Sequence, residues 1–397
     1  MTTTANPKWS DDAFLDHLMG STDDLANATV AELKLDGDLA TTNRILAGLR
    51  TGDQPLPDDA PTPFVRFVEE CAAEAQALDF DARRAAHGAE VFRRWAYPAC
   101  IVMLASSLPN GYAAPCLSNI LTISDNLAVH PYRRLLGVLQ LLVNVSCPGD
   151  DDHEDARTSA LKLRLLHGGV RALVPEHRPQ FEERFGLPVN HEDMLATIMG
   201  FSLLVVDGIE VLGFELEDDD AEDFYYLWSL FTRRMAIAPA DDPTSLEFVP
   251  ENLTDARAFY DSYTRRHFCD DPAHNPDGVL LTQRNRQMMI DLIPKPLRWL
   301  GLGRIPDIAM TELLGPTGMS RVGLNQTAGH HVDKALFHFL LGFGQKAEGL
   351  AEDFYTRFSM LILQDMIDHG MGHVTFSVPG SVEALRKLVV PERGGSS

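Results

Sequence analysis

The chain has 397 residues, which is enough for one large domain or two ordinary ones. Its 45% apolar and 23% charged residues are typical of a globular protein and argue against a disordered chain. The net charge of −23 makes nucleic acid and anionic membrane surfaces poor candidate partners.

The cysteines and the first residues point to a reducing compartment. Five cysteines are scattered along the chain, and none forms a Cys-x-x-Cys pair, so neither a disulfide framework nor a zinc ribbon is predicted. The absence of a Cys-x-x-Cys-His motif argues against the usual covalent c-type haem. The opening "MTTTANPKWSDD" lacks a basic region followed by an apolar run, so we expect a cytoplasmic protein.

Helical spacing dominates the chain from its beginning to its end. We expect a helical arm over 1–50, separated by the Pro-rich "TGDQPLPDDAPTP" (51–63) from the helices that follow. The loops are short, and only "HVTFSV" (373–378) resembles a strand. The sequence therefore predicts an all-α protein with 1–397 as a single domain.

Two later segments give the clearest helix predictions. In "DDDAEDFYYLWSLFTRRMAI" (218–237), acids stand at the start and two arginines near the end, as the helix dipole favours. Its apolar residues recur at i, i+3, i+4 and i+7, namely Phe224, Leu227, Trp228 and Phe231. The most apolar stretch, 194–214, carries Asp207 and Glu210, so we interpret it as a buried helix and not as a membrane span.

One predicted helix, "LKLRLLHGGVRALV" (161–174), contains a single histidine, His167, directly before two glycines. The helix follows an acidic loop and is expected to end at Pro175. Each glycine inside a helix costs on the order of 1 kcal/mol relative to alanine. The pair Gly168-Gly169 therefore predicts that another group approaches the helix backbone closely.

A flat apolar ligand such as haem would be one such group. His167 would bind the iron, Leu163 and Val170 would lie against the porphyrin, and Arg164 and Arg171 would pair with the propionates. A packed, hydrogen-bonded histidine explains the same residues and is the commoner case for such a stretch taken alone. Both interpretations stay open at this point.

Other chemistry was considered and has weaker support. "HGG" also occurs in the oxyanion turn of esterases, but the chain has no G-x-S-x-G motif and no strands to carry one. "DMIDHGMGH" places Asp365, His369 and His373 at i, i+4 and i+8, the best candidate for a non-haem metal site. No nucleotide-binding motif is present, so an enzyme that uses NAD, FAD or ATP is not predicted.

A family resemblance adds to these observations. Between about 110 and 237 the sequence resembles the latex clearing proteins and mpaB-type haem-dependent oxygenases, in three segments that occur in the same order. The segments are "NGYAAPCLSNILTISDNLAVHPYRRLLGVLQLLVNVSCPG", "LKLRLLHGGVRALV" with its Arg-x-x-His-x-x-x-Arg pattern, and "GLPVNHEDMLATIMGFSLLVVDGIEVLG".

The resemblance implies an all-α, globin-like core, placed at 64–260, that holds haem b without a covalent link. Further helices would lie at 1–50 and at 279–397. His167 would stand at the position of the proximal iron ligand, with Arg164 and Arg171 at the flanking arginine positions. Such enzymes use O2 to cleave carbon–carbon double bonds in isoprenoid chains, so a small apolar substrate is expected here.

The distal side departs from the family pattern. Rubber-cleaving relatives carry a Lys-Thr pair just after an arginine. The corresponding residues here are Gly137-Val138 when counted from Arg134, or Leu136-Gly137 when counted from Arg133, and neither pair supplies a lysine or a threonine. Arg134 is a candidate distal charge, although a salt bridge explains it equally well. Thr197 matches a family threonine loosely and is the other catalytic candidate.

The sequence thus predicts a haem b-dependent oxygenase that uses O2 to oxidise or cleave a C=C bond of a small apolar substrate. A non-catalytic haem-binding protein, a peroxidase-like enzyme and a non-haem metal enzyme are the alternatives. Nothing in the sequence specifies the oligomeric state.

Overall fold

The computed structural model describes residues 4–123, 131–146, 155–293, 295–299, 301–325 and 378–381. Within these residues the regular structure is entirely helical, which confirms the all-α class. The expected strand "HVTFSV" lies outside the described residues except for Val378, which belongs to no helix or strand.

The helices before the first gap in the described chain come from the N-terminal third. They are α1 (Asp12–Met19), α2 (Asp24–Asp36), α3 (Leu39–Gly48), α4 (Thr62–Ala77), α5 (Ala82–Val102), α6 (Leu108–Tyr112) and α7 (Pro115–Thr122). The helices after it are α9 (Pro131–Ser146), α10 (Ala156–His177), α11 (Phe181–Phe185), α12 (His191–Phe201), α13 (Leu203–Val211), α14 (Asp218–Arg234), α15 (Leu253–His267), α16 (Pro276–Leu292), α17 (Lys295–Trp299) and α18 (Ile305–Arg321).

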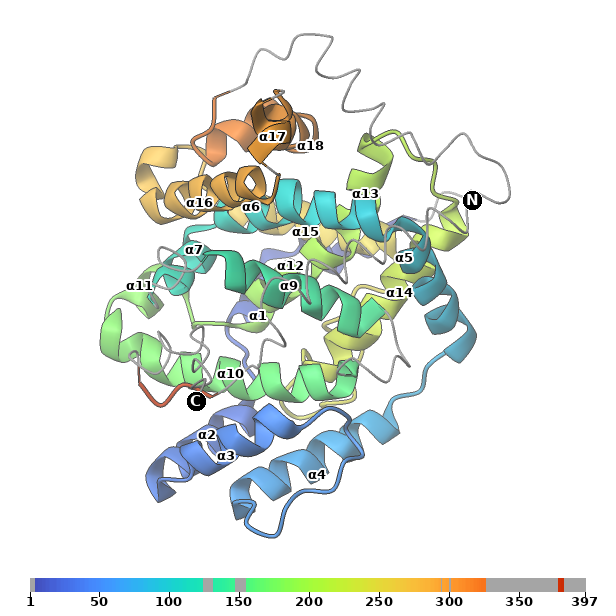
Figure 1. The fold of residues 1–397 in the computed structure, drawn as a ribbon. Helices are drawn as coiled ribbons and strands as arrows, with labels where there is room; N and C mark the ends of the chain where they lie inside the picture. Colours follow the sequence, from blue (N-terminus) through green and yellow to red (C-terminus); the bar gives the residue numbers. More distant parts are fainter. Residues whose placement is uncertain are drawn as a thin grey trace.

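Helix α10 separates two hydrophobic cores. It runs between α9 on one side and the layer of α2, α3 and α4 on the other (Figure 1). Leu161 and Leu165 belong to the smaller core with α2 and α4, whereas Leu163 and Val174 belong to the main core. The 3.6-residue period places these two pairs on different faces of one helix. The two faces of α10 therefore serve different cores.

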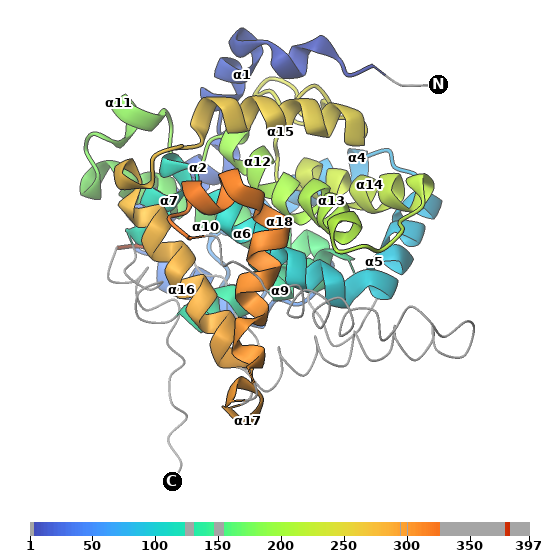
Figure 2. The ribbon, with the colours of Figure 1, turned by 90° about the horizontal axis from the view of Figure 1, so that it is seen from above.

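The N-terminal arm does not stand apart from the rest of the protein. Helix α1 packs into the main core through Leu15 and Leu18, while α2 and α3 build the smaller core together with α4. Figure 2 shows α1 beside α15 at one edge of the bundle, with α17 at the opposite edge.

The helix predicted over 218–237 is present as α14, and its apolar residues are buried as expected. It packs along α5, where the Phe92 and Phe224 rings stack with centroids 6.3 Å apart. Acids occupy the first turn and arginines the last turn, so both ends match the helix dipole.

The apolar stretch 194–214 is buried as predicted, but it is not one helix. It is divided between α12 and α13 at Ser202, whose φ of −113° and ψ of −81° are not helical. Among the described residues, the stretch His191–Val211 is long and apolar enough to cross a membrane, yet 72% of its most apolar window is buried inside the protein.

Helix α5 ends in an irregular segment that no local sequence pattern predicts. After a break at Trp95 and an internal Pro98, a π-helical segment spans Met103–Ser107. The Asn285 side chain of α16 donates a 2.7 Å hydrogen bond to the Leu104 carbonyl in this segment. That bond satisfies a buried carbonyl of the irregular turn.

Candidate functional site

His167 lies at the middle of α10 and is half-buried. The helix begins at an Asp155 cap, whose carboxylate accepts a 2.7 Å hydrogen bond from the Thr158 N–H. It ends at His177, two residues beyond the predicted end at Pro175. A proline in the last turn removes only one hydrogen bond there, so the helix continues past it.

The structure brings His167, Leu163 and Val170 to one face of α10. Leu163 is buried in the main core, and the half-buried Val170 packs against it. One turn of helix separates each of them from His167, so the imidazole has an apolar side chain above and below it. These three predicted site residues therefore form a common surface toward the main core.

Arg164 is engaged inside the protein. Its guanidinium donates to both carboxylate oxygens of Asp23 on α2, at 2.7 and 3.2 Å, and to Glu74 on α4 at 2.5 Å. Burial raises the pKa of Asp23, but the charge and hydrogen bonds of Arg164 outweigh it, so the pKa lies below its usual value. Arg164 thus ties α10 to both neighbouring helices.

Arg171 is also used by the protein. Its Nε donates a 2.6 Å hydrogen bond to the Asn27 side chain, and its Nη1 donates to the Val189 carbonyl at 3.0 Å. Burial, and the neighbouring charge of Arg164, lower the pKa of Arg171 to about 10. The prediction that Arg164 and Arg171 pair with propionates is therefore replaced by these protein contacts, because both arginines lie toward α2.

The glycine pair has a different cause from the one predicted. A Cβ on Gly168 would lie 3.0 Å from the Ala26 carbonyl oxygen of α2, and one on Gly169 would lie 2.6 Å from Pro379 Cδ. The close approach predicted from sequence is present, but the approaching groups are protein backbone and a proline ring. The interpretation of these glycines as a ligand surface is therefore wrong.

Thr197 is the one exposed residue of α12, and every other residue of this helix is buried. Its hydroxyl donates a 2.8 Å hydrogen bond to the Asp193 carbonyl of the preceding turn. Solvent therefore reaches the middle of an otherwise buried helix at this position. Arg134, the other catalytic candidate, lies in the first turn of α9, and its side chain is outside the described residues.

Metal ligands do not gather within the part of the chain that the structure describes. No group of three or more His, Cys, Asp or Glu side chains there is arranged to hold a metal ion. The non-haem candidate formed by Asp365, His369 and His373 lies outside the described residues and stays a prediction.

A buried polar network beside α12 was missed from sequence. Tyr263 of α15 donates a 2.8 Å hydrogen bond to Asp193, and the Cys116 thiol donates to the same oxygen at 3.3 Å. Burial raises the pKa of Asp193, and the nearby His267 and the two donors oppose that rise. The partners come from α7, α12 and α15, so no local pattern could reveal the network.

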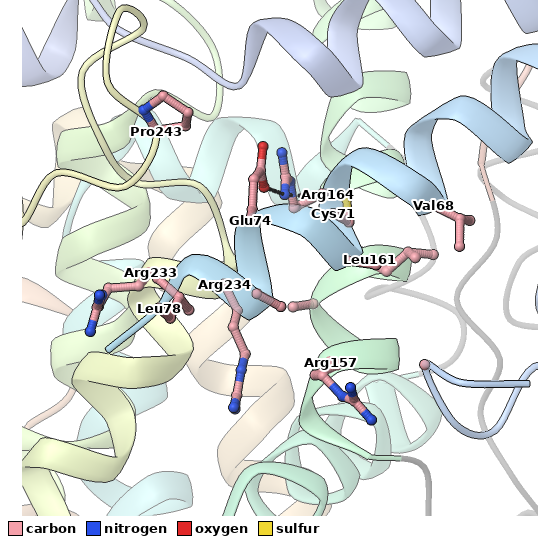
Figure 3. A pocket seen from close by; sticks show the side chains of 14 residues that line it. Val68, Cys71, Glu74, Leu78, Arg157, Leu161, Arg164, Arg233, Arg234 and Pro243 are labelled. Atoms are coloured by element: carbon pink, nitrogen blue, oxygen red, sulfur yellow. Dashed lines mark hydrogen bonds and ion pairs between the residues drawn. The ribbon is translucent and has the colours of Figure 1, made fainter. Parts of the chain in front are cut away.

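A small pocket lies between α4, α10 and the end of α14, on the side of α10 that carries Arg164 (Figure 3). Its lining includes Glu74, Arg157, Arg233 and Arg234, and the last two were predicted only as charges at the end of a helix. Their shared location could not be predicted, because three separate helices supply them.

Comparison with known proteins assigns the chain to a family. Residues 95–343, well over half of the chain, match the catalytic domain described as ER-bound oxygenase mpaB/B'/Rubber oxygenase. Among solved structures, the "Structure of Latex Clearing Protein LCP in the closed state" is similar, with a TM-score of 0.71 and 18% identity. The match covers 91% of this chain and 94% of that one, and no curated protein matches. The protein is therefore a member of the mpaB and rubber oxygenase family, with the all-helical fold of the latex clearing protein.

Proposed function

We propose that this oxygenase is haem b-dependent, with His167 as the axial ligand of the iron. The observation that carries the proposal is the surface of α10 on which His167 stands between Leu163 and Val170. A haem needs one axial side chain and an apolar surface, not a cluster of ligands, and this surface fits both requirements. When bound, the haem iron would supply the activation of O2.

The residues around His167 would position it. Arg164 and Arg171 lie three residues before and four residues after the histidine, and both anchor α10 to α2. Gly168 directly follows His167, and because it has no side chain the α2 backbone packs against α10 at this position. Together these contacts fix the rotation of α10, and therefore the direction in which the imidazole points.

The proposed substrate is a small apolar molecule that carries a C=C bond, for which an isoprenoid is the expected class. The main core beside α10 is apolar, and Thr197 is an exposed hydroxyl on α12, a helix whose other residues are buried. An apolar surface excludes water from an alkene, and the Thr197 hydroxyl would donate a hydrogen bond to the product oxygen after turning from the Asp193 carbonyl. The proposed reaction is oxidation or cleavage of that bond with O2, in keeping with membership of an oxygenase family.

Visible spectra of the purified protein after haem-supplemented expression test the cofactor. We expect a Soret band in the wild type, its loss in His167→Ala, and an unchanged band in His274→Ala, a matched control because His274 is 79% exposed. His369→Ala should also keep the band. Unchanged haem content in His167→Ala would contradict the ligand assignment, and bound iron or zinc without a Soret band would favour the non-haem alternative.

Product analysis tests the reaction. Reduced protein is incubated with O2 and candidate isoprenoid alkenes, and aldehydes or ketones are measured by mass spectrometry. Oxygenated products that carry ¹⁸O from labelled O2 support the oxygenase. A protein that binds haem but forms no product would be a non-catalytic haem carrier, and turnover only with H2O2 would favour the peroxidase-like alternative.

A further inference from the structure

The pocket between α4, α10 and α14 is lined by more guanidinium groups than carboxylates. Arg157, Arg164, Arg233 and Arg234 line it, and Glu74 is its one acidic lining residue. Figure 3 shows Glu74 already paired with Arg164 at one side of the pocket. Burial raises the pKa of the Cys71 thiol, another lining group, to about 12, so it supplies no negative charge.

Arg234 is one of two arginines of this pocket, with Arg233, that form no ion pair with an acid among the described residues. The structure gives its guanidinium no ion pair among the described residues, and its Nε is buried without a hydrogen-bond acceptor. Burial lowers the pKa of Arg234, and Arg157 and Arg233 lower it further, while Asp155 opposes them. Arg234 is half-buried, and its buried Nε–H lacks an acceptor that a ligand in the pocket can supply.

Arg233 adds a second incompletely satisfied group. Its Nη1 donates a 2.8 Å hydrogen bond to the Asp79 carbonyl, whereas its Nε is buried without an acceptor among the described residues. Arg157, on the other side of the pocket, is held in place by Asp53 at 2.8 Å and Asp155 at 3.6 Å. The chain has 57 Asp and Glu residues against 34 Lys and Arg residues. In the part of the chain that the structure describes, Arg233 and Arg234 therefore have no acidic partner even though acidic residues are in excess.

The size of the pocket limits what it can hold. Its volume is about 40 Å³, which accommodates a carboxylate or a phosphate group but no larger ring system. Apolar side chains of α4 and α10 form the remaining wall, among them Val68, Ala72 and Leu161. Such a wall lowers the local dielectric and strengthens charge-assisted hydrogen bonds to an anion.

We propose that this pocket is a binding site for the oxyanion head group of a small molecule, a phosphate or a carboxylate, held by Arg234 and Arg233 with Arg157 at its rim. Guanidinium groups suit both head groups because their planar N–H donors match two oxygens at once. The site is separate from the His167 surface and does not depend on the proposed haem or on the oxygenase reaction.

Isothermal titration calorimetry at low ionic strength tests the site with two probes, inorganic phosphate and acetate. Chloride at equal ionic strength serves as the reference. We expect saturable 1:1 binding of at least one probe with a Kd of about 0.1–1 mM, and the tighter probe identifies the head group. The melting temperature should rise with that probe and not with chloride.

Variants locate the binding. Arg234→Met keeps the length of the side chain and removes its charge, so the Kd should rise at least about tenfold, while Arg234→Lys should lose less. Arg257→Met is the control, since Arg257 pairs with Asp207 on other helices and should leave the Kd unchanged. Equal affinity in Arg234→Met, or no binding of either probe to the wild type beyond chloride, would overturn the proposal. If Arg234→Met does not fold, the wild-type titration and Arg234→Lys decide, and a Kd in Arg234→Lys no higher than that of the wild type would overturn the proposal.

Discussion

Arg164 of α10 and Asp23 of α2 form a buried, two-point ion pair although 141 residues separate them in the sequence. Both side chains are only 3% exposed. Asp23 also caps α2, where it accepts a hydrogen bond of 3.0 Å from the Ala26 N–H. The same α2 turn then meets Gly168, so the ion pair, the cap and the glycine contact all fix one crossing of two helices.

Arg164→Met should destabilise the protein by about 3–5 kcal/mol, because it leaves the Asp23 carboxylate buried without its counter-charge. Denaturant unfolding of the two proteins measures the difference. Arg66→Met is the matched control, since Arg66 pairs with Glu32 at 2.7 Å on the surface, with about half of each side chain exposed. Such a pair contributes less than about 1 kcal/mol. An equal decrease in unfolding free energy in the two variants would show that the buried ion pair stabilises the protein no more than the surface pair does.

Gly168→Ala should lower the free energy of unfolding although alanine favours helix. The new Cβ would lie 3.0 Å from the Ala26 carbonyl oxygen, a backbone atom that cannot move without displacing α2. We expect a net loss of about 1–2 kcal/mol after the helix propensity gain of about 1 kcal/mol.

Gly48→Ala is the companion experiment. Gly48 ends α3 and has no atom within 4 Å of an added Cβ, so alanine should raise the stability there by up to about 1 kcal/mol. If Gly168→Ala stabilised the protein as Gly48→Ala does, the close contact between α2 and α10 would not exist in solution.

Local features of the fold could be predicted, and contacts between distant segments could not. The start and the buried face of α14 follow from its periodicity and its terminal charges, all within one segment, although the helix ends at Arg234 and not at 237. The common surface of His167, Leu163 and Val170 follows from helical spacing in the same way. The groups that contact Arg164 and the glycine pair come from α2, α4 and residue 379. The sequence around α10 does not indicate which of the many acidic and apolar residues of the chain these are.

The glycine pair packs against a neighbouring helix and a proline ring, not against a ligand. The cost of two glycines correctly indicated that something approaches the helix closely, but residue type alone does not distinguish a ligand from a neighbouring backbone. For the candidate site, the position of His167 on a core-facing surface was therefore predictable. The surroundings that hold it, Asp23, Glu74 and Asn27, required the tertiary structure.

His191 should make the protein less stable as the pH falls below neutrality. It is buried, and its two ring nitrogens have no hydrogen-bond partner among the described residues. Burial lowers the pKa of His191 from 6.5 to about 4. The positive charges of Arg171, Arg164 and His17 lower the pKa further, whereas the carboxylate of Asp23 raises it. Between pH 6.5 and pH 4 the imidazole of His191 is protonated in the unfolded chain but neutral in the folded protein. The free energy of unfolding therefore falls as the pH is lowered from about 6.5 to about 4, by up to about 3 kcal/mol.

His191→Leu isolates this contribution. The difference in unfolding free energy between the wild type and His191→Leu should change with pH across that window, while the common contributions of other groups cancel. His87 has the opposite sign, because its hydrogen bond to Asp223 raises its pKa. Its contribution is present below pH 6.5 and is lost as the pH rises through the raised value, so His87→Leu should show the reverse trend. A wild-type minus His191→Leu difference that is constant with pH would contradict the burial of a neutral imidazole.

Thr197→Val should separate catalysis from stability if the proposed oxygenase reaction is correct. The hydroxyl is exposed and bonds only to the carbonyl of its own helix, so its loss should change the unfolding free energy by no more than about 0.5 kcal/mol. Haem content should stay unchanged, while the rate of product formation should fall about tenfold or more, because valine lacks the hydroxyl that would turn from the Asp193 carbonyl to the product oxygen. Thr311→Val is the matched control, since its hydroxyl makes the same bond to the Asp307 carbonyl in α18 at 2.7 Å. Equal rates for the two variants would remove Thr197 from the reaction and leave its exposure as a surface feature of α12.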